Sequence, residues 1–204
     1  MELRIDGLTV EANPGDTLLF LVKKLGLDDS SMSRRPIAAK IAGEVFNLNY
    51  VPVREENHLQ DRTSIRRAMA ASGGNVTLIR YSDPVGKDVY TRTTQFVLFL
   101  ALHLLYPGIR VKMNCTVGKA LYIEVCSNEF SVELLREKMR QLICEDIPLI
   151  RERVPLETAI KHYRDAGQVD KSELLKIRTQ DYFDQYRYGD FADYYYGELA
   201  PSTG

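Results

Sequence analysis

The hydrophobic pattern of this chain is dominated by one long apolar run from Val89 to Tyr106, with the sequence VYTRTTQFVLFLALHLLY. From Phe96 onward every residue of the run except His103 is apolar. This predicts a helix that is hydrophobic on nearly every face and therefore lies in a domain core. A bilayer crossing needs about 20 apolar residues, and a polar TRTTQ segment precedes this run, so we expect a buried helix of a soluble protein. The polar residues at its start would lie beside free backbone N–H groups, and they are Tyr90, Arg92, Thr93 and Thr94.

The first 80 or so residues have the pattern of short strands around one amphipathic helix. Residues 2–12 predict a hairpin, and residues 18–26 predict a helix with a single apolar face. Strand patterns return in residues 36–53, with a tight turn at Gly43-Glu44, and in residues 76–81. A strand pair, a helix and three further strands predict a small β-grasp fold of the ubiquitin type.

The next part of the chain opens with a turn rich in Pro and Gly at residues 82–86, which predicts a domain boundary. Beyond the apolar helix, alternation predicts two strands in residues 109–125. Ser131 is a candidate N-cap for a helix that runs to Ile147. The apolar positions of this helix form one stripe, and they are Val132, Leu135, Met139, Leu142 and Ile143.

The C-terminal part predicts two short helices, in residues 154–167 and 171–177, followed by strand and loop in residues 180–204. The chain is therefore predicted to be an α+β protein of two domains, at residues 1–83 and 87–204.

One segment of the first domain, residues 58–75, does not fit the β-grasp pattern. We predict a mobile insertion here, because Ser72-Gly73-Gly74-Asn75 cannot lie inside a helix. Its arginines, Arg62, Arg66 and Arg67, form the one compact basic cluster, which is typical of a solvated helix face, with an RNA contact as the alternative. The whole chain has 27 Lys and Arg against 28 Asp and Glu, so its net charge of -1 gives no general attraction to nucleic acid or to anionic membranes.

The cysteines, Cys115, Cys126 and Cys144, are widely spaced and odd in number, which suits reduced core thiols better than a disulfide framework. The N-terminus has no apolar segment of the secretory type. We therefore expect a cytoplasmic protein without a membrane partner.

Catalytic motifs are missing from the sequence. Two Gly-Lys pairs, Gly86-Lys87 and Gly118-Lys119, lack both the leading glycine and the following hydroxyl of a P-loop, so this chain is not expected to bind ATP. The histidines lie far apart, and His103 is expected to be a core residue with one hydrogen bond. We accordingly predict no catalytic residue, no metal site and no cofactor in this chain.

The order of these parts resembles a family. The first 83 residues, with IAGEVFNL, resemble the TGS domain that begins threonyl-tRNA synthetases, and residues 87–204 resemble the next domain of those enzymes, the threonyl/alanyl-tRNA synthetase second additional domain, which hydrolyses mischarged tRNA. The family's hydrolytic site has an H-x-x-x-H pair at the start of the buried helix and a C-x-x-x-H pair in a late D-x-C-x-G-x-H segment.

Residue by residue, the segments that carry that site match the family, but the polar residues that would hydrolyse an ester are replaced. The four polar positions fall on Arg92, Phe96, Tyr195 and Leu199, none of which supplies a useful imidazole or thiolate lone pair. Lys171, in GQVDKSELL, and Asp193 match residues that the family also has.

The inherited site is therefore predicted to bind a small anionic or ribose-bearing ligand without catalysis. The candidate ligand-binding residues are Arg92, Lys171, Asp193 and Tyr195, with Arg92 as the anion contact. The other three also have a structural alternative: Asp193 caps a turn, Lys171 pairs only with Asp170 or Glu173, and Tyr195 fills the space left by the lost histidines.

The segments DPVGKDVYTRT and YGDFADYYYGELAPSTG are also similar to bacterial uridine kinase-like proteins, in which the same two domains precede a P-loop kinase of the phosphoribulokinase/uridine kinase family. This resemblance implies a non-catalytic substrate-binding or regulatory region, whose partner is its own C-terminal kinase domain beyond residue 204, with ATP and Mg²⁺ bound there. A tRNA-editing hydrolase or fragment of a threonyl-tRNA synthetase is the alternative. An RNA-binding or assembly module is the third.

Overall fold

The computed structural model describes residues 1–53, 68–109, 111–117, 120–125 and 130–204. The chain forms two compact units. Unit 1 contains residues 1–95, 147–151 and 194–203, and unit 2 contains residues 96–146 and 152–193 together with Gly204. The domain assignment made from the sequence, with its division at residues 83–87, stays a prediction. Both helices and sheets are present, so the α+β class is confirmed.

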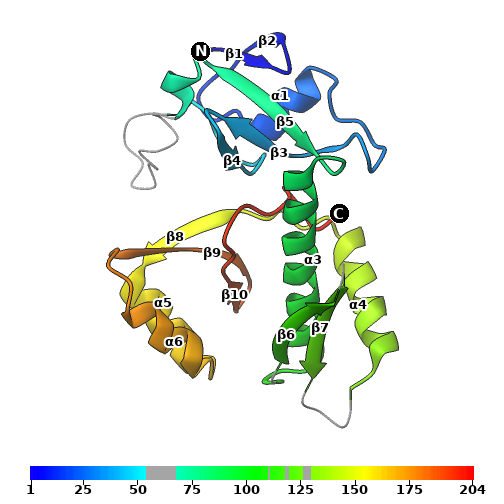
Figure 1. The fold of residues 1–204 in the computed structure, drawn as a ribbon, viewed down its shortest axis with the longest axis vertical. Coiled ribbons are helices and arrows are strands. Elements are labelled where there is room, and N and C mark those ends of the chain that lie inside the picture. The colour runs from blue at the N-terminus through cyan, green and yellow to red at the C-terminus, as the bar shows by residue number, and fades with distance from the viewer. Residues whose placement is uncertain (54–67, 110, 118–119, 126–129) are drawn as a thin grey trace. The chain divides into compact units, whose positions relative to one another are not determined.

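Unit 1 is built on a five-stranded sheet (Figure 1). Its spatial order is β2-β1-β5-β3-β4, in which β1 and β5 are parallel and the other pairs are antiparallel. The strands are β1 (Glu2–Ile5), β2 (Leu8–Glu11), β3 (Pro36–Ile41), β4 (Glu44–Phe46) and β5 (Asn75–Arg80). The predicted hairpin and the strands at residues 36–46 and 75–80 are confirmed.

The helix of this unit is α1 (Leu18–Lys24), as the apolar spacing predicts. The Thr17 hydroxyl accepts a hydrogen bond from the Phe20 N–H at 3.1 Å, which caps the helix start. Its inward side chains, Leu18, Leu21 and Val22, are 0% exposed, so α1 contributes fully buried residues to the core cluster of the sheet.

Two details near β4 differ from the prediction. The tight turn lies at Ala42-Gly43, one residue earlier than expected, because both residues have a positive φ (49° and 90°), as a two-residue hairpin turn requires. Residues 47–53 form no strand. Their carbonyls at Leu48 and Tyr50 instead accept hydrogen bonds from the first N–H groups of α1, at 2.7 and 2.8 Å.

The long apolar helix is α3 (Pro84–Leu105), which begins earlier than the expected Val89. Pro84 suits the first helical position, and the Asp83 carbonyl accepts the first helical hydrogen bond, from Lys87 N–H at 3.0 Å. The predicted turn is thus shortened and Arg92 does not lie beside free N–H groups, so that expectation is wrong. No helix within the described ranges is both long and apolar enough to span a membrane.

Unit 2 contains a hairpin of β6 (Val111–Val117) and β7 (Ala120–Val125), followed by α4 (Val132–Cys144). Ser131 caps α4 as predicted. The helix ends before Ile147, because Asp146 has φ 47° and cannot continue it.

The apolar stripe of α4 is only partly buried. Leu142 is 1% exposed, whereas Val132 and Ile143 are 51% and 44% exposed. Cys144, expected in the core, is exposed as well. Helical spacing identifies one face of a helix, but it does not show how much of that face another element covers.

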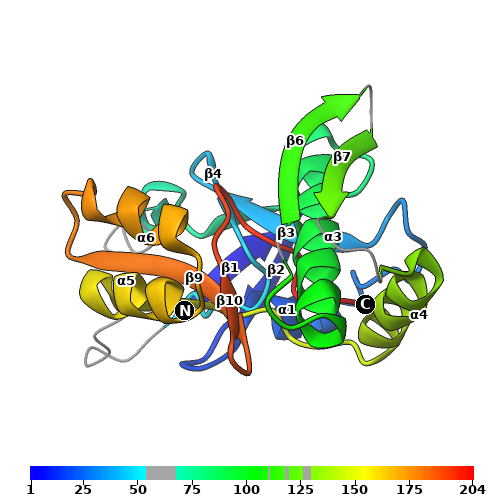
Figure 2. The ribbon, with the colours of Figure 1, turned by 90° about the horizontal axis from the view of Figure 1, so that it is seen from below.

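The rest of unit 2 is a three-stranded sheet, ordered β10-β9-β8, with two helices. Figure 2 shows the two helices, α5 and α6, side by side along β9. Phe183 of the sheet packs against Tyr163 of α5, with ring centroids 6.1 Å apart. The elements are β8 (Arg151–Pro155), α5 (Leu156–Asp165), α6 (Val169–Lys176), β9 (Tyr182–Tyr188) and β10 (Phe191–Asp193).

Several predictions fall outside the described residues. These are most of the insertion, with Arg62, Arg66 and Arg67, and the second Gly-Lys pair. The C-terminal end of the predicted insertion is described, and there Ala68 and Met69 are 5% and 4% exposed in the core of unit 1. That end is therefore part of the packed domain.

Candidate functional site

The four predicted ligand-binding residues divide between the two units. Lys171 and Asp193 belong to unit 2, whereas Arg92 and Tyr195 belong to unit 1. The structure brings Lys171 and Asp193 together: the Lys171 Nζ atom lies 2.7 Å from the Asp193 Oδ1 atom. Glu173, one of the local partners that the sequence offers to Lys171, pairs with Lys176 on the same helix turn.

The Lys171–Asp193 pair joins α6 to the edge strand β10. The Asp193 side chain is 10% exposed and the Lys171 side chain 34%, so the carboxylate is largely desolvated while the ammonium group reaches solvent. Lys171 Nζ also lies 5.5 Å from the centre of the Tyr163 ring, a distance at which the ring attracts a cation. This arrangement presents a hydrogen-bond acceptor and a donor side by side on a rigid sheet edge.

A second group of charges lies on the same three-stranded sheet. The Glu152 Oε1 atom accepts hydrogen bonds from Gln185 Nε2 and Arg187 Nε, both at 2.7 Å. Arg153 holds Asp184 with two hydrogen bonds, at 2.9 and 3.2 Å. We did not predict these contacts, because β8 was not recognised as a strand; the only signal was the alternation of charge in Arg151-Glu152-Arg153-Val154.

Two histidines of unit 2 have distinct surroundings. Burial lowers the pKa of His162, and the charge of Arg187 lowers it further, against the opposing carboxylates of Asp165, Asp190 and Glu152. His103 Nε2 lies 3.1 Å from Asp190 Oδ1, and this hydrogen bond lowers the pKa of the Asp190 carboxyl group. The His103 side chain is 34% exposed, so it has one hydrogen bond as predicted but lies at the edge of the core.

Two of the positions at which the resembled family has polar site residues, Phe96 and Leu199, are buried in this structure. Phe96 is 0% exposed, and its ring lies 5.5 Å from that of Phe191 and 6.4 Å from that of Tyr186. Leu199 is also 0% exposed. Within the described ranges no three His, Cys, Asp or Glu residues gather in a group that could hold a metal ion. Phe96 and Leu199 therefore serve packing.

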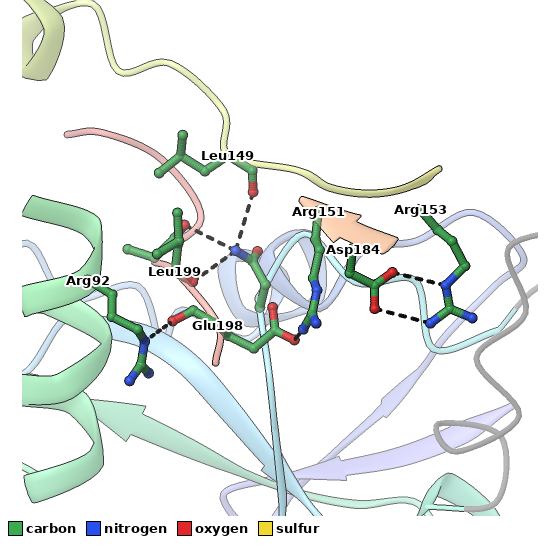
Figure 3. Close-up of polar contacts among 9 residues, drawn as sticks. Arg92, Leu149, Arg151, Arg153, Asp184, Glu198 and Leu199 are labelled. Carbon is green, nitrogen blue, oxygen red and sulfur yellow. Dashed lines mark hydrogen bonds and ion pairs between the residues drawn. The ribbon is translucent and has the colours of Figure 1, made fainter. Parts of the chain in front are cut away.

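In unit 1, the C-terminal segment is attached to the loop after β4 and to α3. The Asn47 amide Nδ2 donates to the Leu199 carbonyl at 2.9 Å and to the Ala200 carbonyl at 3.1 Å, and the Thr93 hydroxyl accepts from the Ala200 N–H at 2.8 Å. Arg92 Nε donates to the Glu198 carbonyl at 3.1 Å (Figure 3). Arg92 is thus an anchored side chain within unit 1.

The comparisons with known proteins give one consistent result. No family model matches the chain. It is 28% identical over 204 residues to threonine–tRNA ligases of Desulforamulus reducens and Clostridium kluyveri, and 27% identical over 203 residues to that of Rubrobacter xylanophilus. Each alignment covers 98% of this chain but only 28–29% of the relative, so the chain spans less than a third of the length of these proteins.

These relatives correct the functional expectation. A uridine kinase-like or nucleoside kinase parent, with an ATP-binding kinase domain, is wrong, because the relatives that match nearly the whole chain are threonine–tRNA ligases. The kinase interpretation was a resemblance quoted on two segments and extended to essentially the whole chain, whereas the relatives found over 98% of the chain are threonine–tRNA ligases. Over nearly its whole length the chain is similar to a region of threonine–tRNA ligases.

Proposed function

We propose that this region binds the aminoacylated 3′ end of a tRNA at Lys171 and Asp193, without hydrolysing it. The observation that carries the proposal is the ion pair itself. The two residues that the chain shares with the resembled editing domain, 22 positions apart, meet at 2.7 Å on one sheet edge. Arg92 and Tyr195, the other predicted ligand contacts, are not required by this proposal.

The chemistry of the ligand suits the pair. An aminoacyl ester on a terminal ribose carries a positive α-ammonium group, a carbonyl and sugar hydroxyls. Asp193 accepts from the ammonium and hydroxyl groups, and Lys171 donates to the carbonyl or to a phosphate oxygen. Because Asp193 is largely removed from water, these charged hydrogen bonds are stronger than they would be on an open surface.

We expect binding without hydrolysis because the polar residues of the resembled editing site are replaced in this chain. Hydrolysis of an ester needs a group that takes a proton from water, and a hydrocarbon side chain such as Phe96 or Leu199 has no lone pair to do so. Arg92 remains protonated at neutral pH and is no better as a base.

We further propose the finer fold assignment that the resemblance implies. The sheet order of unit 1, with β1 parallel to β5 and hairpins on both sides, supports a TGS-like β-grasp domain in residues 1–83. Residues 87–204 are then the degenerate editing-like domain. A determined structure of the chain with tRNA tests this assignment together with the binding site.

The direct test compares charged and uncharged RNA. Fluorescence anisotropy would measure the dissociation constants of an acceptor-stem minihelix of threonine tRNA, with and without a stable amide-linked serine at its 3′ end. We expect the wild type to prefer the charged form, and Asp193→Asn to reduce that preference about tenfold or more through the loss of a charged hydrogen bond. Lys176→Met, which removes an exposed lysine of the same helix, is the matched control and should leave the preference unchanged.

Equal binding of both forms by the wild type would contradict the proposal. The same proteins should also be incubated with seryl-tRNA and assayed for release of serine. Deacylation that disappears in His162→Ala would replace the binding function by an editing one, since the His162 ring lies 5.4 Å from that of Tyr163, beside Lys171.

A further inference from the structure

Arg92 has a geometry that the proposed function does not use. Its guanidinium group lies against the backbone of Gly197, where an added Cβ atom would be 2.8 Å from Cζ, 3.0 Å from Nη2 and 3.1 Å from Nε. The three distances are nearly equal, so the plane of the guanidinium group faces this glycine. Gly197 also has φ 131°, a backbone conformation that other residues rarely adopt. The position of the arginine therefore depends on a glycine here.

The hydrogen bond of the Arg92 side chain uses only its Nε atom, which leaves the terminal amino groups available to bind a ligand. Nε is occupied by the Glu198 carbonyl at 3.1 Å, which fixes the rotation of the group. The two terminal amino groups make no hydrogen bond or ion pair with any residue that the structure describes. Asp88, one helical turn earlier, is exposed and forms no ion pair with Arg92 within the same part of the chain. A half-buried guanidinium group is thus held in place with two donor groups uncommitted.

A second arginine adds to the positive charge. Arg151 Nη1 lies 2.8 Å from Glu198 Oε1, and the residue Glu198 is 5% exposed. Figure 3 shows Arg92 and Arg151 on either side of Glu198. Arg92 contacts the backbone carbonyl of Glu198, whereas Arg151 contacts its carboxylate, so two guanidinium groups lie beside one acidic residue. Arg92 itself forms no ion pair with a carboxylate among the described residues, and an uncompensated positive charge that is partly desolvated favours an anion.

We propose that Arg92, supported by Arg151, is a binding site for a phosphate group. The forked donors of a guanidinium group match two oxygens of a phosphate, which a single ammonium group does not. The phosphate belongs either to the backbone of an RNA or to a free phosphate compound. The residues of this site belong to unit 1, whereas Lys171 and Asp193 belong to unit 2, so the proposal goes beyond the proposed function and does not depend on it.

The test uses the full chain and inorganic phosphate, pyrophosphate and unacylated threonine tRNA as probes. NMR would follow the Nε–Hε signal of Arg92 during titration, and filter binding would measure the tRNA. We expect Arg92→Gln to weaken binding of at least one probe about tenfold, through the loss of charged hydrogen bonds. Arg92→Lys, which keeps the charge but not the fork, should lose part of that affinity. Arg34→Gln, which removes an exposed arginine of unit 1, should change it less than about twofold.

The probes distinguish the two sources of phosphate. If Arg92→Gln loses affinity only for phosphate and pyrophosphate, the site is assigned to free phosphate compounds. A loss of tRNA affinity, with a decrease of about one in the slope of log K against log salt concentration, assigns it to the RNA backbone. The proposal is overturned if Arg92→Gln and the wild type bind all three probes equally, or if the wild type binds none. Circular dichroism checks that each variant is folded. If Arg92→Gln does not fold, the comparison of Arg92→Lys with the wild type tests the proposal instead.

Discussion

At the scale of single residues, the sequence suggested candidate side chains but did not predict which of them meet in space. Lys171 and Asp193 were selected from a motif, but their contact joins a helix to a strand 22 positions away, and spacing along the chain carries no information about such a distance. Leu199 and Phe96 were predicted to stand at positions where the resembled family has polar residues, and both are completely buried. Arg92 was assigned to a helix start, which was wrong because Pro84 begins the helix.

A residue-scale prediction concerns His162. Burial lowers its pKa below the ordinary value of 6.5, so the unfolded chain binds a proton more readily than the folded one. The free energy of unfolding is therefore highest, with respect to His162, above pH 6.5, where the ring is neutral in both states. It decreases as the pH falls through 6.5, because the unfolded chain then gains a proton that the folded chain does not. Thermal melting at pH 7.5 and pH 5.5 should show a smaller loss of stability for His162→Gln than for the wild type. An equal loss in both proteins would show that His162 is not the source.

At the scale of elements, alternation and helical spacing identified the strands of unit 1, α1 and α4, because each has a regular apolar period. The strand β8 was missed because its sequence, RERVP, has no apolar alternation. Its Glu152 and Arg153 side chains are instead satisfied by Asp184, Gln185 and Arg187 of β9. The start of α3 was misplaced for a related reason. A Pro-Gly segment is typical of a turn, but here Gly86 is needed inside the first helical turn.

An element-scale prediction follows from Gly86. A Cβ atom at this position would lie 1.8 Å from the Arg80 carbonyl oxygen and 2.7 Å from its carbon, so the end of β5 and the start of α3 could not keep their present distance. In an open helix, Gly→Ala would be stabilising by about 1 kcal/mol. Here we expect Gly86→Ala to lower the free energy of unfolding by about 1–3 kcal/mol, as overpacking does. Urea denaturation measures this, with the exposed Lys87→Ala as control; a stabilised Gly86→Ala would contradict the close contact.

At the scale of the whole molecule, the order of secondary elements was largely predictable, whereas the composition of the compact units was not. Unit 1 collects residues 1–95 with two distant segments, 147–151 and 194–203. The side chains that join them, Asn47 and Asn49, are common turn residues and carry no sequence signal of a long-range role. The functional assignment shows the same limit, since a resemblance of the two predicted domains, quoted on two segments, suggested a kinase, while the relatives that cover 98% of the chain are threonine–tRNA ligases.

The last prediction tests what attaches the C-terminal segment to unit 1. The Asn47 amide donates to the carbonyls of Leu149, Leu199 and Ala200, at 3.3, 2.9 and 3.1 Å, and the residue is 7% exposed. Asn47→Ala leaves these carbonyls without that donor, so we expect the free energy of unfolding to fall by about 1–3 kcal/mol. Asn47→Asp, which keeps the shape but donates nothing, should be at least as unstable, and the exposed Asn13→Ala should resemble the wild type. Denaturation curves measure the stability, and hydrogen exchange of the Ala200 and Thr203 amides should accelerate in both Asn47 variants. Unchanged exchange at these amides would mean that other contacts, such as the bond from Ala200 to Thr93, suffice to hold the segment.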